Sequence, residues 1–484
     1  MKIKYMVCVI VLLFALSSVA APPAGRVPTA YKGSAEMKVD NTTYIDANRI
    51  LMFVTNHGNF GRDLSDLFGY DYGTWFPYTG DTADIGGNID KAGDYSPYYA
   101  GGLWMGAIDS ATNEKRVIIS EYSDEYVPGP MNDTVEVIYD TLTTDPLVVD
   151  TIVNRTFMTD RPEFKVYKLF RDSLEANPNQ AYLDYLRYAI AQGAPYKVTD
   201  EGDTIPDMIG DQMCWSVFND ADTAQHNNDA GTTNPLGIEV RNTTFAFDRQ
   251  GSLGNIVIIR LHVFNKGDRI LKDCYFSIWS DPDLGSAGDD LVGCDTNLSL
   301  GYVYNATNND SQYGEAPPAL GIDFFQGPLI AGGPADTAFM WGDTIPGFKN
   351  MGMTSFNKYI NGTDPDDFEQ TYNYMTGKTR TGEDYIYDGQ VLKYVHTGNP
   401  VTGEGDLDIA PADRRWMQST GPIIFRPGDS TEILAAIIVG QGNSNLNSIT
   451  VVKQLDDFAQ QLYENGFNPP KPPARPVVTL TELH

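Results

Sequence analysis

Alternation of apolar and polar positions is the commonest pattern in this chain, and it predicts strands far more often than helices. Residues 274–279 read CYFSIW, so Cys274, Phe276 and Ile278 share one face of a strand and the residues between them share the other. Further segments rich in Val, Ile, Thr and Tyr and bounded by turn residues predict strands at 50–54, 116–121, 134–141, 147–158 and 164–170.

Two pairs of predicted strands favour an immunoglobulin-like sandwich. Residues 257–263 alternate, the turn 265–268 (NKGD) follows, and residues 270–279 return, which predicts a β-hairpin. Downstream, residues 421–440 supply two strands around a Pro-Gly-Asp turn, and the second of these strands is apolar on both faces. Strand pairs of this kind are typical of the opening and closing halves of such a sandwich. The segment 281–420 is then a large loop-rich insertion.

One segment has a clear helical period. In residues 448–465, apolar side chains recur at steps of three and four, Asn447 or Ser448 can cap the start, and Gly466 ends the pattern. We expect the apolar face of this helix to pack on the sandwich. Residues 182–192 fit neither a helix nor a strand well.

The length of the chain predicts two β-rich domains. We expect an N-terminal β-rich domain over 44–240 and the sandwich, with its insertion and packing helix, over 241–466. Residues 467–484 predict a stiff Pro-rich linker and the start of a truncated module.

The N-terminus predicts export from the cytoplasm. Lys2 and Lys4 precede an apolar stretch that ends in small residues, which is typical of a secretory signal peptide over residues 1–20. The apolar stretch is too short to span a bilayer comfortably, and no later segment is apolar enough to be transmembrane. Residues 21–43 predict an extended leader.

The charge of the chain argues against nucleic acid as a partner. The formal net charge is −30, and removal of the signal peptide with its two lysines makes it −32. A protein of this charge does not neutralise phosphates. Acidity is common in secreted proteins, but it also suits loading with cations.

An acidic, glycine-rich loop after the strand 274–279 is the strongest candidate for a metal site. Its carboxylates are crowded on a backbone that is free to bend, so they need a counter-charge, and Ca²⁺ is the cation that oxygen ligands favour outside the cell. The loop does not match an EF-hand. Hydrogen bonds within turns are the alternative way of holding it. The predicted ligands are Asp281, Asp283, Asp289, Asp290 and Asp295.

The mature chain has three cysteines, of which two could pair in an oxidising compartment. Cys274 and Cys294 flank the acidic loop, so a disulfide between them would close its base. Cys214 could equally pair with Cys294.

Residues 70–106 are dense in Gly, Tyr and Trp. Trp75 and Trp104 could form a surface on which sugars stack, although aromatic residues among glycines more often form an irregular core. Paired carboxylates could serve a glycoside hydrolase, but so many acids make such pairs common by chance. No HExxH, Gly-x-Ser-x-Gly or phosphate-binding motif is present, which weakens the case for an enzyme.

Several segments resemble a family of large secreted proteins from Gram-negative bacteria that use type IX secretion. They include TNHGNFG (55–61), YYAGGLWMGA (98–107), GDQMCWSVFND (210–220), and the stretch from WSDPDLG at 279 through GYVYN at 301–305. PLGIEV (235–240), MTSFNKYING (353–362) and the stretch from DRRWMQSTGP to VGQG (413–442) complete the set. The resemblance implies an extracellular, modular protein that continues into fibronectin type III-like modules and a C-terminal sorting domain, which this sequence lacks. It implies no catalytic residues.

These observations favour a secreted or cell-surface protein with a structural or adhesive role, stabilised by Ca²⁺ and without enzymatic activity. An extracellular carbohydrate-binding protein or glycoside hydrolase is the alternative. An extracellular polysaccharide or a cell-surface molecule would be the partner in either case.

Overall fold

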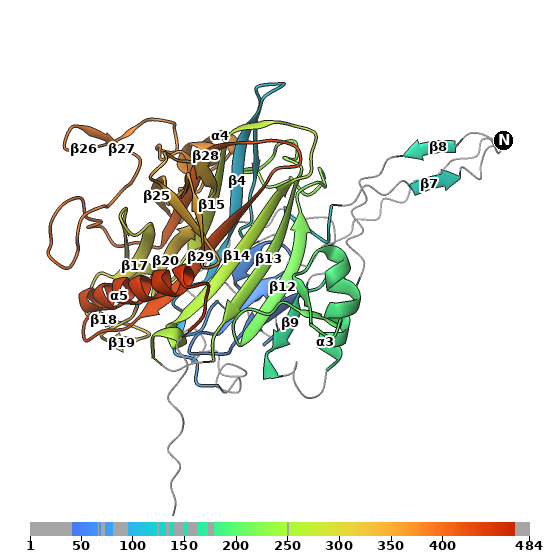
Figure 1. Ribbon diagram of the computed structural model, residues 1–484. Coiled ribbons are helices and arrows are strands. Elements are labelled where there is room, and N and C mark those ends of the chain that lie inside the picture. Colours follow the sequence, from blue (N-terminus) through green and yellow to red (C-terminus); the bar gives the residue numbers. More distant parts are fainter. Residues whose placement is uncertain are drawn as a thin grey trace, which may run out of the picture.

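The computed structural model describes residues 41–65, 67–68, 73–80, 95–122, 125–131, 136–139, 149–152, 162–172, 179–248 and 251–469. Over these residues the protein is mainly β, as the sequence predicts (Figure 1). The predicted signal peptide, nearly all of the predicted leader, and the predicted linker and module beyond residue 469 lie outside the described residues.

Two large antiparallel sheets form the body of the protein. The first sheet follows the order β1, β2, β3, β4, β15, β28, β25, with β5 beside β4. Its strands are Thr42–Ile45 (β1), Met52–Thr55 (β2), Asn59–Gly61 (β3), Ala100–Asp109 (β4), Lys115–Ile118 (β5), Leu271–Asp281 (β15), Ser355–Ile360 (β25) and Arg414–Phe425 (β28).

The second sheet follows the order β16, β17, β20, β29, β14, β13, β12, β6, with β9 beside β12. Its strands are Val127–Pro128 (β6), Tyr167–Phe170 (β9), Gln212–Asn219 (β12), Ile238–Ala246 (β13), Ile256–Asn265 (β14), Asp290–Asp295 (β16), Leu300–Asn305 (β17), Ala319–Gln326 (β20) and Ser430–Gly440 (β29).

Small hairpins and short helices complete the described fold. The hairpins are Glu136–Tyr139 with Val149–Ile152 (β7, β8), Tyr196–Val198 with Thr204–Pro206 (β10, β11), Asn309–Asp310 with Gly314–Glu315 (β18, β19), Leu329–Ala331 with Phe348–Asn350 (β21, β24), Thr337–Met340 with Asp343–Pro346 (β22, β23), and Tyr385–Tyr387 with Gln390–Leu392 (β26, β27). The α-helices are Gln180–Asp184 (α3), Phe368–Met375 (α4) and Asn445–Glu464 (α5), and α3 continues into a π turn, Tyr185–Ala189, and a 3-10 turn, Ile190–Gln192.

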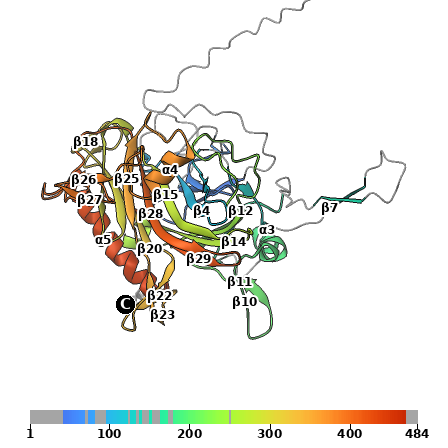
Figure 2. The ribbon, with the colours of Figure 1, turned by 90° about the horizontal axis from the view of Figure 1, so that it is seen from above.

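The protein has four layers, with the two sheets packed face to face between helices. Alternate side chains of β14 and β29 point into the core between the sheets, and the intervening apolar ones belong to a second cluster that includes residues of α5. In the first sheet, Phe276 and Ile278 point into the same core, whereas Tyr275 and Trp279 pack outward with residues of α4. Figure 2 shows α5 against one sheet and α4 beside the other. This layering explains why β29 is apolar on both faces.

The predicted hairpin over residues 257–279 is wrong. β14 pairs with β13 and β29, whereas β15 pairs with β4 and β28, so the turn between β14 and β15 crosses from one sheet to the other. The turn between β28 and β29 crosses in the same way. The two crossings are joined where the Asn265 N–H donates to the Asp429 carbonyl at 3.0 Å and the Gly428 N–H donates to the Asn265 carbonyl at 2.8 Å. The predicted sandwich is confirmed. However, β14 pairs with β29 and β15 pairs with β28, so each strand of the first predicted pair lies beside a strand of the second.

The predicted domain boundary at residue 240 falls inside β13 and needs correction. β4 pairs with β15, and β12 with β13, so residues on both sides of this boundary share both sheets. Strands from the predicted insertion 281–420 are also members of the sheets, since β20 pairs with β29 and β25 with β28. Pairing between strands that are far apart in the sequence cannot be predicted from the local pattern of apolar and polar residues.

The predicted helix 448–465 is α5, which begins at Asn445 and ends at Glu464. Its cap is Ser444, whose side chain accepts a hydrogen bond from the Asn447 N–H. Residues 182–192 are helical.

Candidate functional site

Several central strands of the first sheet begin or end on the same side of the sheet, where their termini lie next to one another. The register pairs Asp281 with Ala100 and Ile360 with Arg414, so β15 and β25 end where β4 and β28 begin. Neighbouring antiparallel strands run in opposite directions, so the start of one lies beside the end of the next. Side chains that lie far apart in the sequence therefore converge here.

Three carboxylates meet at this edge, and we call them the strand-end cluster: Asp281, Asp283 and Asp413. Asp281 is the last residue of β15, and Asp413 directly precedes β28. One carboxylate oxygen from each of the three lies within 4.8 Å of the other two. Asp281 and Asp283 are buried, with 2% and 4% of their surface exposed, while Asp413 is half-buried.

Among the described residues, Arg415 is the cation that contacts the strand-end cluster. Arg415 Nη2 lies 3.4 Å from Asp281 Oδ2, and its Nη1 lies 3.3 Å from Asp364 Oδ1. Tyr122 donates its hydroxyl to Asp281 and accepts a hydrogen bond from Arg415 Nε at 3.1 Å. These contacts hold Asp281 and Asp364, and the one guanidinium faces two carboxylates.

The remaining imbalance is visible in the titration of the acids. Burial raises the pKa of Asp281; the Arg415 guanidinium opposes this rise, and the Asp413 carboxylate adds to it. Burial also raises the pKa of Asp413. Burial raises the pKa of Glu121 to about 7, and the negative charges of Asp364 and Asp281 contribute to this rise. The site therefore favours either protons or a further cation.

The geometry of the strand-end cluster fits a hard divalent cation. Ca²⁺ takes oxygen ligands at about 2.3–2.6 Å, so two ligands of one ion are at most roughly 5 Å apart. The three oxygens satisfy this limit. In addition, Asp281 Oδ1 and Asp413 Oδ1 are buried and accept no hydrogen bond from the described residues.

The structure brings together only two of the five predicted ligands. Asp290 Oδ2 accepts the Leu284 N–H at 3.0 Å, and Asp289 Oδ1 accepts from Asn305 Nδ2 at 3.1 Å. Asp290 therefore holds the loop and Asp289 joins it to β17, which agrees with the alternative that hydrogen bonds hold this loop. Of the five predicted ligands, only Asp281 and Asp283 lie in the strand-end cluster, where Asp413 is the third carboxylate.

Asp295 lies at the end of β16, where its Oδ2 pairs with Lys453 Nζ of α5 at 2.8 Å. It is not a member of the strand-end cluster.

Asp413 and its neighbour Arg415 were not predicted as site residues, because both follow the acidic loop by more than a hundred residues. The sequence did contain one indication of this site: Asp413 directly precedes a strand, and Asp281 ends another. Only the pairing of β15 with β28 shows that these positions meet.

The predicted stacking surface for sugars is wrong, because both tryptophans are buried. Trp104 has no exposed surface; its ring stacks on Trp279 at a centroid distance of 5.6 Å, and its Nε1 donates to the Ser120 carbonyl at 3.0 Å. Trp75 is 7% exposed. Gly102 allows this packing, since a Cβ there would lie 2.1 Å from the Ser120 carbonyl oxygen. The aromatic residues form a core, which was the other interpretation of this segment.

The predicted disulfide is also absent. Cys274 lies in β15 of the first sheet and Cys294 in β16 of the second, and both are buried free thiols. Cys214 is a buried free thiol as well, and burial raises the pKa of its side chain to about 12.

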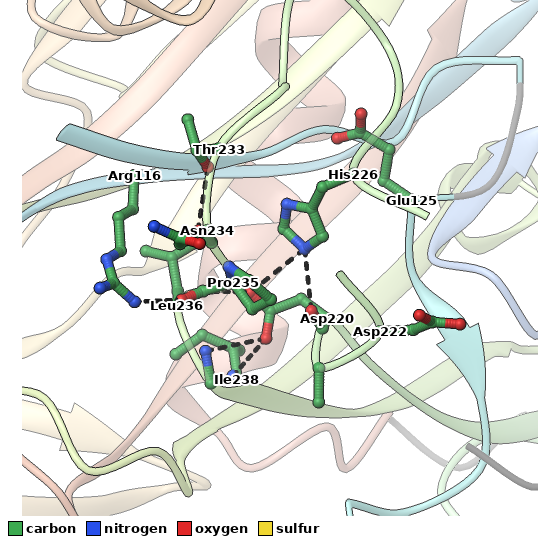
Figure 3. A network of polar contacts seen from close by, with 12 residues as sticks. Arg116, Glu125, Asp220, Asp222, His226, Thr233, Asn234, Pro235, Leu236 and Ile238 are labelled. Atoms are coloured by element: carbon green, nitrogen blue, oxygen red, sulfur yellow. Dashed lines mark hydrogen bonds and ion pairs between the residues drawn. The ribbon is translucent and has the colours of Figure 1, made fainter. Parts of the chain in front are cut away.

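A second buried polar network fixes the loop between β12 and β13 (Figure 3). The Asp220 carboxylate accepts backbone N–H groups from Leu236 at 2.6 Å, Gly237 at 3.0 Å and Ile238 at 2.6 Å. His226 Nε2 lies 2.8 Å from the Asp220 carbonyl and 3.9 Å from its Oδ2. Burial raises the pKa of Asp220, while His226 and the N–H groups oppose that rise. All these contacts organise backbone, so we assign the network a structural role.

A pocket of about 420 Å³ opens between the β4–β5 turn, residues 232–234 and the start of α4. Lys115 and Glu369 in its lining pair with each other. The pocket contains neither the strand-end cluster nor the predicted tryptophans.

Comparison of the chain with models of known protein families finds no family model that matches, and comparison with curated proteins finds no match. Among the described residues, no helix has both the length and the apolar character needed to cross a membrane.

Proposed function

We propose that this protein is a non-enzymatic extracellular structural or adhesive protein whose sandwich is stabilised by Ca²⁺ at the strand-end cluster. The observation that carries the proposal is the convergence of three carboxylate oxygens from Asp281, Asp283 and Asp413 within 4.8 Å of one another.

Calcium at this position would join parts of the chain that only the fold brings together. Asp281 is the last residue of β15, Asp283 follows this strand, and Asp413 precedes β28; the two strands are neighbours in the first sheet. An ion bound there would neutralise carboxylates that Arg415 balances only in part. A structural role also suits the buried Asp220 network, whose polar groups hold backbone.

An extracellular location is supported by the predicted signal peptide and by the resemblance to secreted proteins of bacteria with type IX secretion. Fluids outside the cell are also where a site of moderate affinity is filled by calcium, since extracellular modules bind it with Kd values of about 10⁻⁴–10⁻³ M. An extracellular polysaccharide or cell-surface molecule is the partner that we propose. The alternative of a carbohydrate-active protein loses its main support, because Trp75 and Trp104 are buried.

Calorimetric titration of Ca²⁺ into the full chain, after treatment with EGTA, tests the proposal. We expect one site that Asp413→Asn abolishes, because this change removes a charged ligand at the more exposed position of the cluster. Asp295→Asn is the matched control, since Asp295 is an aspartate at the end of β16 that pairs with Lys453 away from the cluster. Absence of Ca²⁺ binding to the unmodified chain, or equal binding by Asp413→Asn, would refute the proposal.

A further inference from the structure

Two carboxyl groups face each other in the apolar layer between α5 and the second sheet. Asp323 lies in β20 and Asp456 in α5, and each has 1% of its surface exposed. In β20, Ile322 and Phe324 point into the core between the sheets, so Asp323 between them points toward α5. Asp323 Oδ1 and Asp456 Oδ1 are buried and have no hydrogen-bond partner among the described residues, and each carboxyl group lies close enough to the other to change its pKa.

Asp456 occupies a position at which the helix otherwise presents apolar side chains. Val452, Leu455 and Ala459 lie on the same buried face of α5, one turn or less away. Opposite Asp323, the neighbouring strand β29 contributes Ala436, which is also buried. The side chains named here are apolar and offer the pair no hydrogen bonds, although the Phe324 N–H acts on Asp323.

The charged groups around the pair do not neutralise it. Lys453 is on the same helix, but its Nζ is bound to Asp295 Oδ2 of β16 at 2.8 Å. Asp457 is exposed on α5 and adds a negative charge. Two carboxylates cannot both be ionised at such a position, because each would lack a counter-charge and both would repel each other.

We propose that Asp323 and Asp456 share a proton that fastens α5 to the second sheet, and that loss of this proton in alkaline solution loosens the helix. The protonated carboxyl donates to the ionised one, as in other pairs of acids that share a site. When the proton leaves for hydroxide or a buffer base, two negative charges remain in the apolar layer. The inference is independent of the calcium proposal, because the pair lies between α5 and β20 and not at the strand-end cluster.

The pH dependence follows from the titration of the two acids. Burial raises the pKa of Asp456 to about 7, and burial followed by the facing carboxyl raises that of Asp323 well above its usual range. An acid whose pKa is raised on folding stabilises the folded state below its unfolded pKa, and this stabilisation is lost as the pH rises through the folded value. The window therefore extends from about pH 4 upward past pH 7.

Urea unfolding of the full chain at a series of pH values tests the inference. Within the window, one proton bound only by the folded state raises the unfolding constant about tenfold for each pH unit. Asp456→Asn supplies an amide donor to Asp323 without a titrating proton, so we expect this part of the slope to disappear and the variant to be more stable than the unmodified protein in alkaline solution. Asp457→Asn, on the exposed face of the same helix, controls for the general effect of charge and should keep the slope.

Hydrogen exchange of the α5 amides distinguishes loosening of the helix from a change elsewhere. We expect protection of α5 in the unmodified chain to fall between about pH 6 and about pH 9, after correction for intrinsic exchange, and to persist in Asp456→Asn. Equal pH slopes for the unmodified chain and Asp456→Asn would overturn the inference, and so would α5 protection that is independent of pH.

Discussion

At the scale of single residues, buried polar and aromatic groups of this protein serve the fold more than they serve a surface. The tryptophans and carboxylates that stand out in the sequence mostly have partners inside the molecule. Trp104 and Asp220 are the clearest examples, and each allows a direct test.

Trp104→Ala should destabilise the protein by about 3–5 kcal/mol, because it leaves a cavity beneath Trp279 and an unpaired Ser120 carbonyl. Urea unfolding measures the loss, and titration with soluble polysaccharides serves as the parallel assay. A variant of unchanged stability that has lost binding to a sugar would show that Trp104 belongs to a stacking surface after all.

Asp220→Asn should cost about 1–3 kcal/mol, because an amide NH₂ group would replace one of the oxygens that accept three buried N–H groups. Asp222→Asn is the matched control, since the Asp222 carboxylate accepts only the exposed Ala224 N–H. The difference between the two variants in chemical unfolding is the quantity to compare. Equal stabilities would mean that Asp220 does not hold the loop in Figure 3.

At the scale of elements, local patterns predicted strands and the one long helix but not their partners. The alternation in 257–263 and the helical period in 448–465 each arise from the buried face of a single element. Such patterns can therefore be recognised from the sequence. The choice of β29 rather than β15 as the neighbour of β14 depends on the turn geometry and on contacts across the sandwich. The pattern also did not predict that Asp456 is buried, because the buried face of a helix is recognised by its apolar residues.

Ser444→Ala should destabilise α5, because Ser444 Oγ accepts the Asn447 N–H at 3.1 Å and caps the first turn. Loss of such a cap costs about 1 kcal/mol. Ser444→Asp keeps an acceptor at the same position and should restore most of the stability. Denaturant midpoints of the two variants provide the comparison, and identical midpoints would indicate that the cap contributes nothing.

At the scale of the whole molecule, the candidate site depends on strand pairing that no local pattern contains. Asp281 and Asp283 were identifiable as a crowded acidic loop, whereas Asp413 joins them only because β28 lies beside β15. The same crossing of distant segments merges the two predicted domains into one pair of sheets. A cation at the strand-end cluster would therefore stabilise the sandwich as a unit rather than a single loop.

The most direct test of this account is the melting temperature of the full chain in excess Ca²⁺ and in EGTA. A ligand that binds only the folded state at a hundred times its Kd adds about 2.7 kcal/mol, which corresponds to a rise of roughly 3 °C in a protein of this size. We predict such a rise for the unmodified chain and none for Asp413→Asn. The same melting temperature in both solutions would contradict the account.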